Sequence, residues 1–132
     1  MKLASISENF KIEKRISITP EIAKKYLSLG FEVIVSKNYG SHLGFSDKEY
    51  LDLGVNTSSS EEEVLKKGDI IAQVGLPSEE NLKYLRENQT LIGVLNPYLN
   101  KEKITQLIDK KINNFSLELL PRITRAQSMD VL

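Results

Sequence analysis

Residues 19–35 read TPEIAKKYLSLGFEVIV and contain the unit on which the whole chain is built. Thr19 followed by Pro20 predicts a helix start, because threonine caps free backbone N–H groups and proline lacks the N–H that would have no intrahelical partner. Gly30 predicts the helix end, since glycine adopts the left-handed conformation without a Cβ clash. The apolar run Phe31–Val35 then predicts a short buried strand. A helix that leads directly into a buried strand is typical of α/β proteins.

The same alternation extends along the chain. Four further apolar runs are predicted strands: Leu3–Ile6, Asp69–Val74, Thr90–Leu95 and Phe115–Leu119. Further helix starts are predicted by the capping boxes Ser46 with Glu49 and Ser60 with Glu63, by Ser78 before two acids, and by Asn100, whose helix would reach about Lys111. We therefore expect an α/β fold, Rossmann-like or flavodoxin-like, in which helices flank a mostly parallel sheet.

The composition excludes several classes of function. The 132 residues include 18 Lys plus Arg and 18 Asp plus Glu, so no basic field would recruit nucleic acid. There is no cysteine and only one histidine, His42 in a predicted loop, which argues against a metal site and a Ser-His-Asp triad. No run approaches the ~18 apolar residues of a membrane helix, and we expect a cytoplasmic protein.

The end of the chain predicts one more helix. Thr124 and Gln127 form a capping box, and Ala126, Met129 and Leu132 would share one helical face. No glycine, proline or basic residue ends this helix before the sequence stops. We therefore expect the natural chain to continue.

Two stretches carry candidate binding residues, although no glycine spacing gives a dinucleotide-binding or phosphate-binding loop. Arg15 falls between a predicted strand and the proline-initiated helix, at the edge where parallel sheets bind ligands; a surface ion pair is the alternative. The second stretch, PRITRAQSMD, places Arg122, Arg125, Gln127 and Asp130 around a helix start. Their donors and acceptors could hold a carboxamide, although capping and a solvated surface also explain Gln127 and Asp130.

The arginines add to the interest of the second stretch. Only four of the 18 basic residues are arginines, and two of them lie in PRITRAQSMD. A chain that otherwise uses lysine indicates by this choice that a planar, bidentate donor is needed there.

The chain resembles, over essentially its whole length, the amino-terminal domain shared by alanine dehydrogenase and the NAD-binding alpha subunit of nicotinamide nucleotide transhydrogenase. PRITRAQSMD is its most specific part and resembles the transhydrogenase branch. That resemblance implies that Arg122, Gln127 and Asp130 contact the nicotinamide end of NAD(H), and we include Arg125 as a cofactor-binding candidate. The other stretches that carry the resemblance are EKRISITP, LGFEVIVSKNYGSHLGFSDKEYLDLGV, IIAQVGLPSEE and LRENQTLIGVLNP.

Departures from the alanine dehydrogenase pattern favour the transhydrogenase branch. Alanine dehydrogenases, as the resemblance implies, hold pyruvate with an arginine and a lysine and use a histidine as acid/base. Here Arg15 is retained as a possible pocket residue, but Gly75 stands in the place of the lysine and Asn96 in that of the histidine. An amine-forming dehydrogenase must move a proton as well as a hydride, whereas transhydrogenation needs neither group. We expect no catalytic acid/base residue.

The resemblance implies a larger assembly around this chain. It implies an alpha-subunit homodimer that binds NAD(H) and passes hydride to NADP⁺ on a beta-subunit domain, coupled to proton movement through a membrane partner. The chain would be peripheral to the inner membrane through these subunits. Residues 1–132 would be an incomplete amino-terminal domain without the Rossmann NAD-binding domain, inactive alone. The alternatives are an alanine dehydrogenase-like enzyme and a non-catalytic assembly module of the same fold.

Overall fold

The computed structural model describes residues 1–117, which form a six-stranded parallel sheet with the order β3-β2-β1-β4-β5-β6. The strands are β1 (Lys2–Ser5), β2 (Glu32–Ser36), β3 (Asn56–Ser58), β4 (Ile70–Ala72), β5 (Thr90–Gly93) and β6 (Asn113–Ser116). The helices are α1 (Pro20–Ser28), α2 (Asp47–Leu53), α3 (Glu61–Lys67), α4 (Glu79–Leu82) and α5 (Lys101–Asp109), with a 3₁₀ turn at Ser41–Leu43. The predicted α/β fold with a parallel sheet flanked by helices is confirmed.

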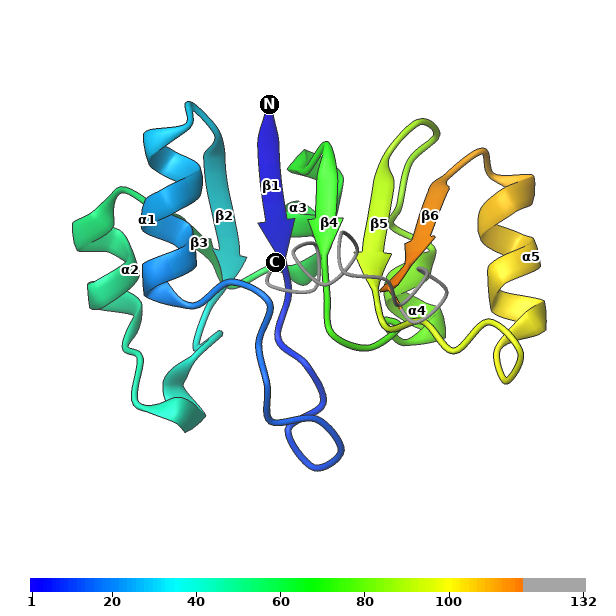
Figure 1. The fold of residues 1–132 in the computed structure, drawn as a ribbon, viewed down its shortest axis with the longest axis horizontal. Helices are drawn as coiled ribbons and strands as arrows, with labels where there is room; N and C mark the ends of the chain where they lie inside the picture. The colour runs from blue at the N-terminus through cyan, green and yellow to red at the C-terminus, as the bar shows by residue number, and fades with distance from the viewer. Residues whose placement is uncertain (118–132) are drawn as a thin grey trace, which may run out of the picture.

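The helices divide between the two faces of the sheet. Figure 1 shows α1 and α2 beside β2 and β3, and α3 and α4 behind the sheet. Leu3 and Val33 belong to the apolar cluster that includes α1 and α2 residues, whereas their chain neighbours Ala4 and Ile34 belong to the cluster that includes α3, α4 and α5 residues. This division follows from the strand geometry, because successive side chains point to opposite faces.

The predicted helix starts are confirmed at atomic level. Thr19 Oγ1 accepts a hydrogen bond from the backbone N–H of Ile22 at 3.3 Å. The hydroxyls of Ser46, Ser60 and Ser78 each accept from the backbone N–H three residues on, at 3.2 to 3.3 Å. Each bond satisfies one of the N–H groups that a helix start leaves free.

The end of α1 is also close to the prediction. Leu29 is the C-cap of the helix, and Gly30 follows it with a φ of 95°. Glycine is favoured in this left-handed conformation because it has no Cβ, so the chain can turn sharply into β2.

Two capping details differ from the sequence predictions. Glu63 does not complete the predicted capping box; its Oε2 accepts from the Ser58 hydroxyl at 2.9 Å, and the Ser60 N–H donates to Ser58 Oγ at 3.1 Å. Asn100 precedes α5, but its side chain makes no capping bond. Its Nδ2 donates instead to the carbonyl of Leu95 at 2.9 Å, so the asparagine ties the helix start back to the end of β5.

Two strand predictions were incomplete. β3 was missed because its residues, Asn56–Ser58, are polar and only three long, so no apolar run marks them. β6 begins at Asn113, two residues before the predicted strand at Phe115, because backbone pairing with β5 and not side-chain hydrophobicity defines this edge. The predicted helix starting at Thr124 lies outside the described residues.

Gly93 tests how closely β4 and β5 approach. A Cβ added at Gly93 would lie 2.5 Å from the carbonyl oxygen of Gln73, a backbone atom that cannot move aside. At Gly75 the nearest atom would be Glu8 Oε1 at 3.5 Å, an ordinary contact, and Gly75 lacks a left-handed φ. We expect Gly93→Ala to lower the free energy of unfolding by about 2 kcal/mol and Gly75→Ala to change it by less than about 0.5 kcal/mol. Urea denaturation followed by circular dichroism measures both; equal effects would contradict the close approach.

Candidate functional site

The candidate site lies at the carboxyl ends of β1 and β4, the two middle strands of the sheet. From β1 the chain proceeds towards β2 and β3, whereas from β4 it proceeds towards β5 and β6. Ligands of open parallel sheets bind where neighbouring strands diverge in this way, because the connections leave a crevice between them. The residues that follow these strands, from Ile6 and from Gln73 onward, therefore form the candidate site.

Glu8 lies in this crevice and accepts three hydrogen bonds. Its Oε2 accepts from Gln73 Nε2 at 2.7 Å and from the backbone N–H of Val74 at 2.9 Å. Its Oε1 accepts from the backbone N–H of Gly75 at 3.0 Å. Burial raises the pKa of Glu8 above its ordinary value, although these donors act in the opposite direction. The carboxylate thus clamps the loop after β1 to the loop after β4.

Gln73 continues the pairing of β1 and β4 beyond the end of their backbone ladder. Its Oε1 accepts from the backbone N–H of Ile6 at 2.7 Å, and its Nε2 donates to the carbonyl of Ile6 at 3.0 Å. The side-chain amide therefore satisfies both backbone groups of Ile6 where the strands separate, and it is 4% exposed. Such complete pairing is required of a buried amide.

Tyr39 holds the segment that returns from the crevice to α1. Its hydroxyl oxygen accepts from the backbone N–H groups of Ser17 and Ile18, both at 3.1 Å, and lies 2.8 Å from Ser5 Oγ. Because the two N–H groups occupy the oxygen's acceptor positions, the Tyr39 proton is donated to Ser5. Burial raises the pKa of Tyr39 to about 12, so the phenol stays neutral. Tyr50 adds a bond from its hydroxyl to the Ile18 carbonyl at 2.8 Å.

Arg15, the weaker of the two candidates from the sequence, lies on the segment that Tyr39 holds. Its guanidinium donates to both carboxylate oxygens of Glu13, at 2.8 and 2.9 Å, and its side chain is 74% exposed. Hydrogen bonds from Arg15 lower the pKa of Glu13 to about 2. The surface ion pair is therefore formed, and Arg15 also lines a cavity, so the structure supports both readings of this residue.

That cavity has a volume of about 660 Å³ and lies on the α1 side of the sheet. Its size is within the range of small-molecule sites, but its walls are mostly apolar. Arg15, Ser17 and Gln73 are the polar residues among its described walls, and the apolar side chains come from α1, its flanking segments and three strands: Leu3, Ile16, Ile18, Ile22, Tyr26, Phe31, Ile70, Ala72, Val74, Ile92, Val94 and Leu117.

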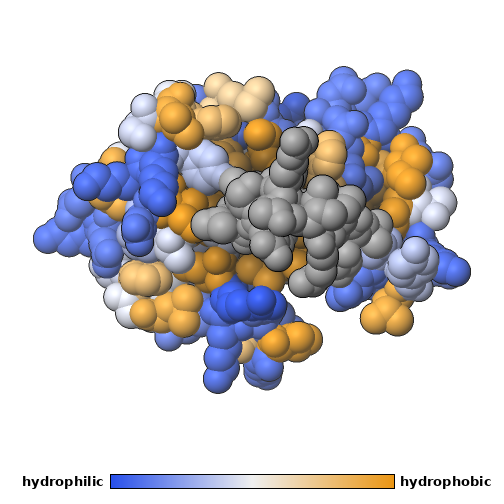
Figure 2. Space-filling view, in the orientation of Figure 1, coloured by the Kyte–Doolittle hydropathy of each residue, from blue (hydrophilic) through white to orange (hydrophobic). Residues whose placement is uncertain are grey.

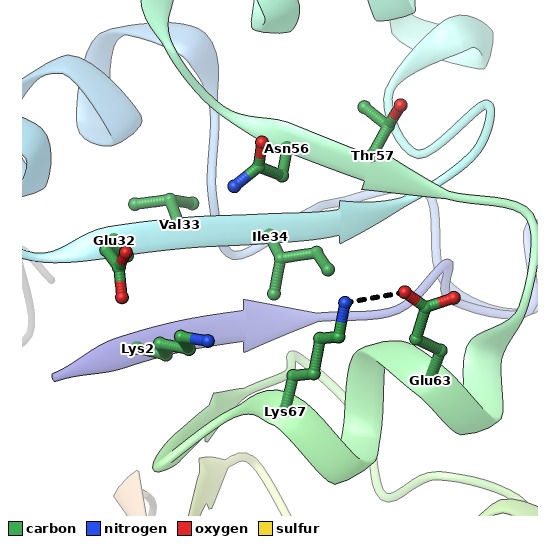
Figure 3. A pocket seen from close by; sticks show the side chains of 8 residues that line it. All are labelled: Lys2, Glu32, Val33, Ile34, Asn56, Thr57, Glu63 and Lys67. Carbon is green, nitrogen blue, oxygen red and sulfur yellow. Dashed lines mark hydrogen bonds and ion pairs between the residues drawn. The ribbon is translucent and has the colours of Figure 1, made fainter.

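A second hollow, of about 250 Å³, lies beside α3 and the edge formed by β2 and β3 (Figure 3). Lys67 Nζ contacts Glu63 Oε1 at 2.7 Å within the helix. Both side chains are about half exposed, and such a pair one helical turn apart is an ordinary feature of a solvated helix surface. We assign no function to this hollow.

Gly75 and Asn96 lie at the same edge of the sheet, after the neighbouring strands β4 and β5. The N–H of Gly75 donates to Glu8, so a side chain at this position would start beside that carboxylate. Asn96 has a φ of 48°, a left-handed conformation that asparagine tolerates better than most residues. The positions where the alanine dehydrogenase pattern has lysine and histidine therefore belong to this edge and carry neither side chain.

Sequence reasoning missed Glu8, Gln73 and Tyr39. Most of their partners are backbone groups of distant segments, and no spacing in the sequence marks such bonds. The other candidates, Arg122, Arg125, Gln127 and Asp130, lie outside the described residues. Within residues 1–117, no cluster of three acidic or histidine side chains could hold a metal ion. In the same stretch of the chain, no helix has the length and apolar character needed to cross a membrane.

Comparison with known proteins gives consistent results. The family described as "Alanine dehydrogenase/PNT, N-terminal domain" matches residues 5–132. The first part of an NAD(P) transhydrogenase subunit alpha, from Rickettsia prowazekii, is 38% identical over 100% of this chain and 36% of its own length. The crystal structure of transhydrogenase from Sinorhizobium meliloti has a TM-score of 0.88 and 34% identity, covering 98% of this chain and 39% of that one.

The alanine dehydrogenase branch is represented as well. Alanine dehydrogenase 1 from Staphylococcus aureus is 28% identical over 96% of this chain and 34% of its own length. The chain therefore spans little more than a third of the relatives that it matches.

The clamp of Glu8 predicts an unusual pH dependence. Because its folded pKa is raised above 4.5, the folded state favours the protonated acid, and that contribution to stability is lost as pH rises through the folded pKa. The free energy of unfolding of the unmodified protein minus that of Glu8→Gln should therefore fall between about pH 4 and pH 7. Urea denaturation at several pH values, with ¹³C NMR titration of the Glu8 carboxyl, measures this.

Glu13→Gln is the matched control, since the pKa of Glu13 is lowered to about 2. Its contribution is present above the ordinary carboxyl pKa and is lost as pH falls, so the corresponding difference should rise with pH. A Glu8 midpoint at or below 4.5 would contradict the burial of its carboxylate.

Proposed function

Because the chain belongs to the alanine dehydrogenase/PNT N-terminal domain family and is similar over its whole length to transhydrogenase alpha subunits, we propose that it is part of the NAD(H)-binding component of a proton-translocating NAD(P) transhydrogenase. In this function hydride passes from NADH to NADP⁺. The protein's task is to position the two nicotinamide rings, because no proton is transferred to or from a substrate.

The carboxyl edge of the sheet carries this proposal. Gly75 and Asn96 lie there without the amine and imidazole that an amine-forming dehydrogenase uses. The carboxylate of Glu8 is engaged by three N–H donors, which leaves it to hold the loops together. Such an edge suits a reaction that needs orientation and no acid/base group.

The described residues fit one end of a dinucleotide better than the other. The crevice between β1 and β4 is the position where such folds bind the cofactor, but residues 1–117 contain no glycine-rich loop at a helix start for a pyrophosphate. NAD(H) supplies the hydride when bound. Arg122, Gln127 and Asp130 would hold its carboxamide through their complementary donors and acceptors, with Arg125 beside them. The Rossmann domain that binds the remainder would lie elsewhere in the complete protein.

The assembly belongs to the proposal as well. The Rickettsia relative is named as a subunit, which indicates further subunits for that protein. For this chain we propose an alpha-subunit homodimer that docks on a beta subunit, whose domain holds NADP(H), and on a membrane domain that carries the proton path. The chain itself would lie on the cytoplasmic side of the inner membrane.

An alanine dehydrogenase-like function is the second candidate. It is favoured by Arg15, which lines the cavity at the crevice and could bind a substrate carboxylate in place of Glu13. Its weakness is the lack of a lysine at position 75 and of a histidine at position 96. A non-catalytic assembly module of the same fold is a third possibility.

The complete protein, assembled with its partner subunit, tests the proposal. We expect NADH to reduce an NADP⁺ analogue, and Asp130→Asn and Gln127→Ala each to lower kcat by about tenfold or more, since a misplaced ring reacts slowly. Lys101→Ala, on exposed α5, is the control and should leave the rate unchanged. Oxidation of NADH that depends on pyruvate and ammonium, without transhydrogenation, would favour the second candidate.

The chain of residues 1–132 gives a separate test. It contains at most the nicotinamide half of the site, so we expect an NAD⁺ dissociation constant of about 1 mM or weaker. Isothermal titration calorimetry measures it. Micromolar binding would contradict the division of the site between this domain and a separate Rossmann domain.

A further inference from the structure

One face of the sheet is covered unequally by the described helices. On the side of α1 and α2, the strands β1 and β2 pack against those helices, and β4 lies at the border of that cluster. On the opposite side, residues of α3, α4 and α5 join a cluster with β4 and β5 side chains. Among residues 1–117, no helix forms a buried cluster with side chains of β5 or β6 on the α1 side.

The side chains of this part of the sheet are apolar and lie in register. Ala72 of β4 pairs with Ile92 of β5, and Ile92 pairs with Phe115 of β6, so the three point to the same face. Ile70 and Val94 continue this surface along their strands, and Phe115 is 56% exposed. We call these five residues the open face. In Figure 2, hydrophobic residues gather towards the middle of the molecule and hydrophilic residues at its margins.

The cavity described above lies on the open face. Ile22 and Tyr26 of α1 form one of its walls, and Leu117 lines it from the β6 side. Leu117 directly follows β6 and is the last described residue, so the chain leaves the sheet at the border of the cavity. The next segment of the chain therefore starts beside an apolar surface that needs cover.

We propose that residues 118–132 of the same chain pack onto the open face as an amphipathic helix preceded by a short connection. Seven of these fifteen residues are apolar: Leu119, Leu120, Ile123, Ala126, Met129, Val131 and Leu132. At 100° per residue Ala126, Met129 and Leu132 share one face, which would contact the sheet, whereas Val131 lies opposite Met129.

The reach of this segment agrees with an intramolecular contact. β6 and β1 are three strand positions apart, or about 14 Å. A helix over residues 124–132 is about 13 Å long. It can therefore cross β5 and β4 towards α1 without a second copy of the chain. Because Arg15 lines the same cavity, this docking brings the PRITRAQSMD stretch and Arg15 to one site.

Spin labelling tests the docking in the full 132-residue chain, which has no cysteine of its own. A nitroxide on Ser128→Cys should broaden the methyl NMR signals of Ile70, Ile92 and Val94. The same label on Lys48→Cys, on exposed α2, should leave these signals unchanged. Absence of broadening from Ser128→Cys would overturn the proposal.

A mixed sample separates this contact from one between two copies. Spin-labelled chains without ¹³C are mixed with ¹³C-labelled chains without nitroxide, so any broadening must arise between molecules. We expect none. Broadening of equal size in the mixed sample would overturn the proposal in favour of a second copy on the open face.

A matched pair of substitutions gives an independent measurement. Met129→Asp would place a charge against the open face and should lower Tm by about 5 °C. Val131→Asp introduces the same charge on the opposite side of the helix and should change Tm by less than about 1 °C. Equal shifts for the two variants would overturn the proposed orientation.

Discussion

The buried amide of Gln73 is the interaction on which the candidate site depends. β1 and β4 pair through their backbones only as far as Ala4 and Ile71, and then their connections diverge. Divergence leaves the N–H and C=O of Ile6 without a strand partner, and Gln73 supplies both hydrogen bonds from one side chain. It also donates to Glu8, which binds the two following N–H groups of the β4 loop. The crevice is therefore closed at its floor and open only above it.

The segment above this floor is held by groups that remain neutral. The Tyr39 phenol links Ser5 at the end of β1 to Ser17 and Ile18, and its pKa of about 12 keeps it protonated under ordinary conditions. The charged pair of this segment, Arg15 with Glu13, lies towards solvent, where ion pairs add little stability. Structure and recognition are thus divided: buried neutral groups fix the loop, and its charges are left for contacts with a ligand or partner.

The sequence predicts the parts of this fold that depend on local chemistry. Thr19, Ser46, Ser60 and Ser78 cap helices because the N–H groups they satisfy lie three residues away, and Gly30 ends α1 because only its own backbone matters. β3 was not predictable from its polar residues, because its pairing partner lies about twenty residues earlier in β2. Glu8 was missed for the same reason on a longer scale: its donors are more than sixty residues away. The predicted site in PRITRAQSMD lies outside the described residues and remains a prediction.

The choice between two chemistries within this family rests on what the carboxyl edge of the sheet lacks. A lysine at position 75 would start beside the carboxylate of Glu8 and would compete with the backbone N–H groups for it. Glycine leaves Glu8 to those N–H groups, and Asn96 accepts a left-handed turn at the end of β5. Neither residue can exchange a proton with a substrate near neutral pH. An edge organised in this way can position a ring but cannot protonate an imine, and this limitation is compatible with hydride transfer between two nicotinamides and not with amine formation.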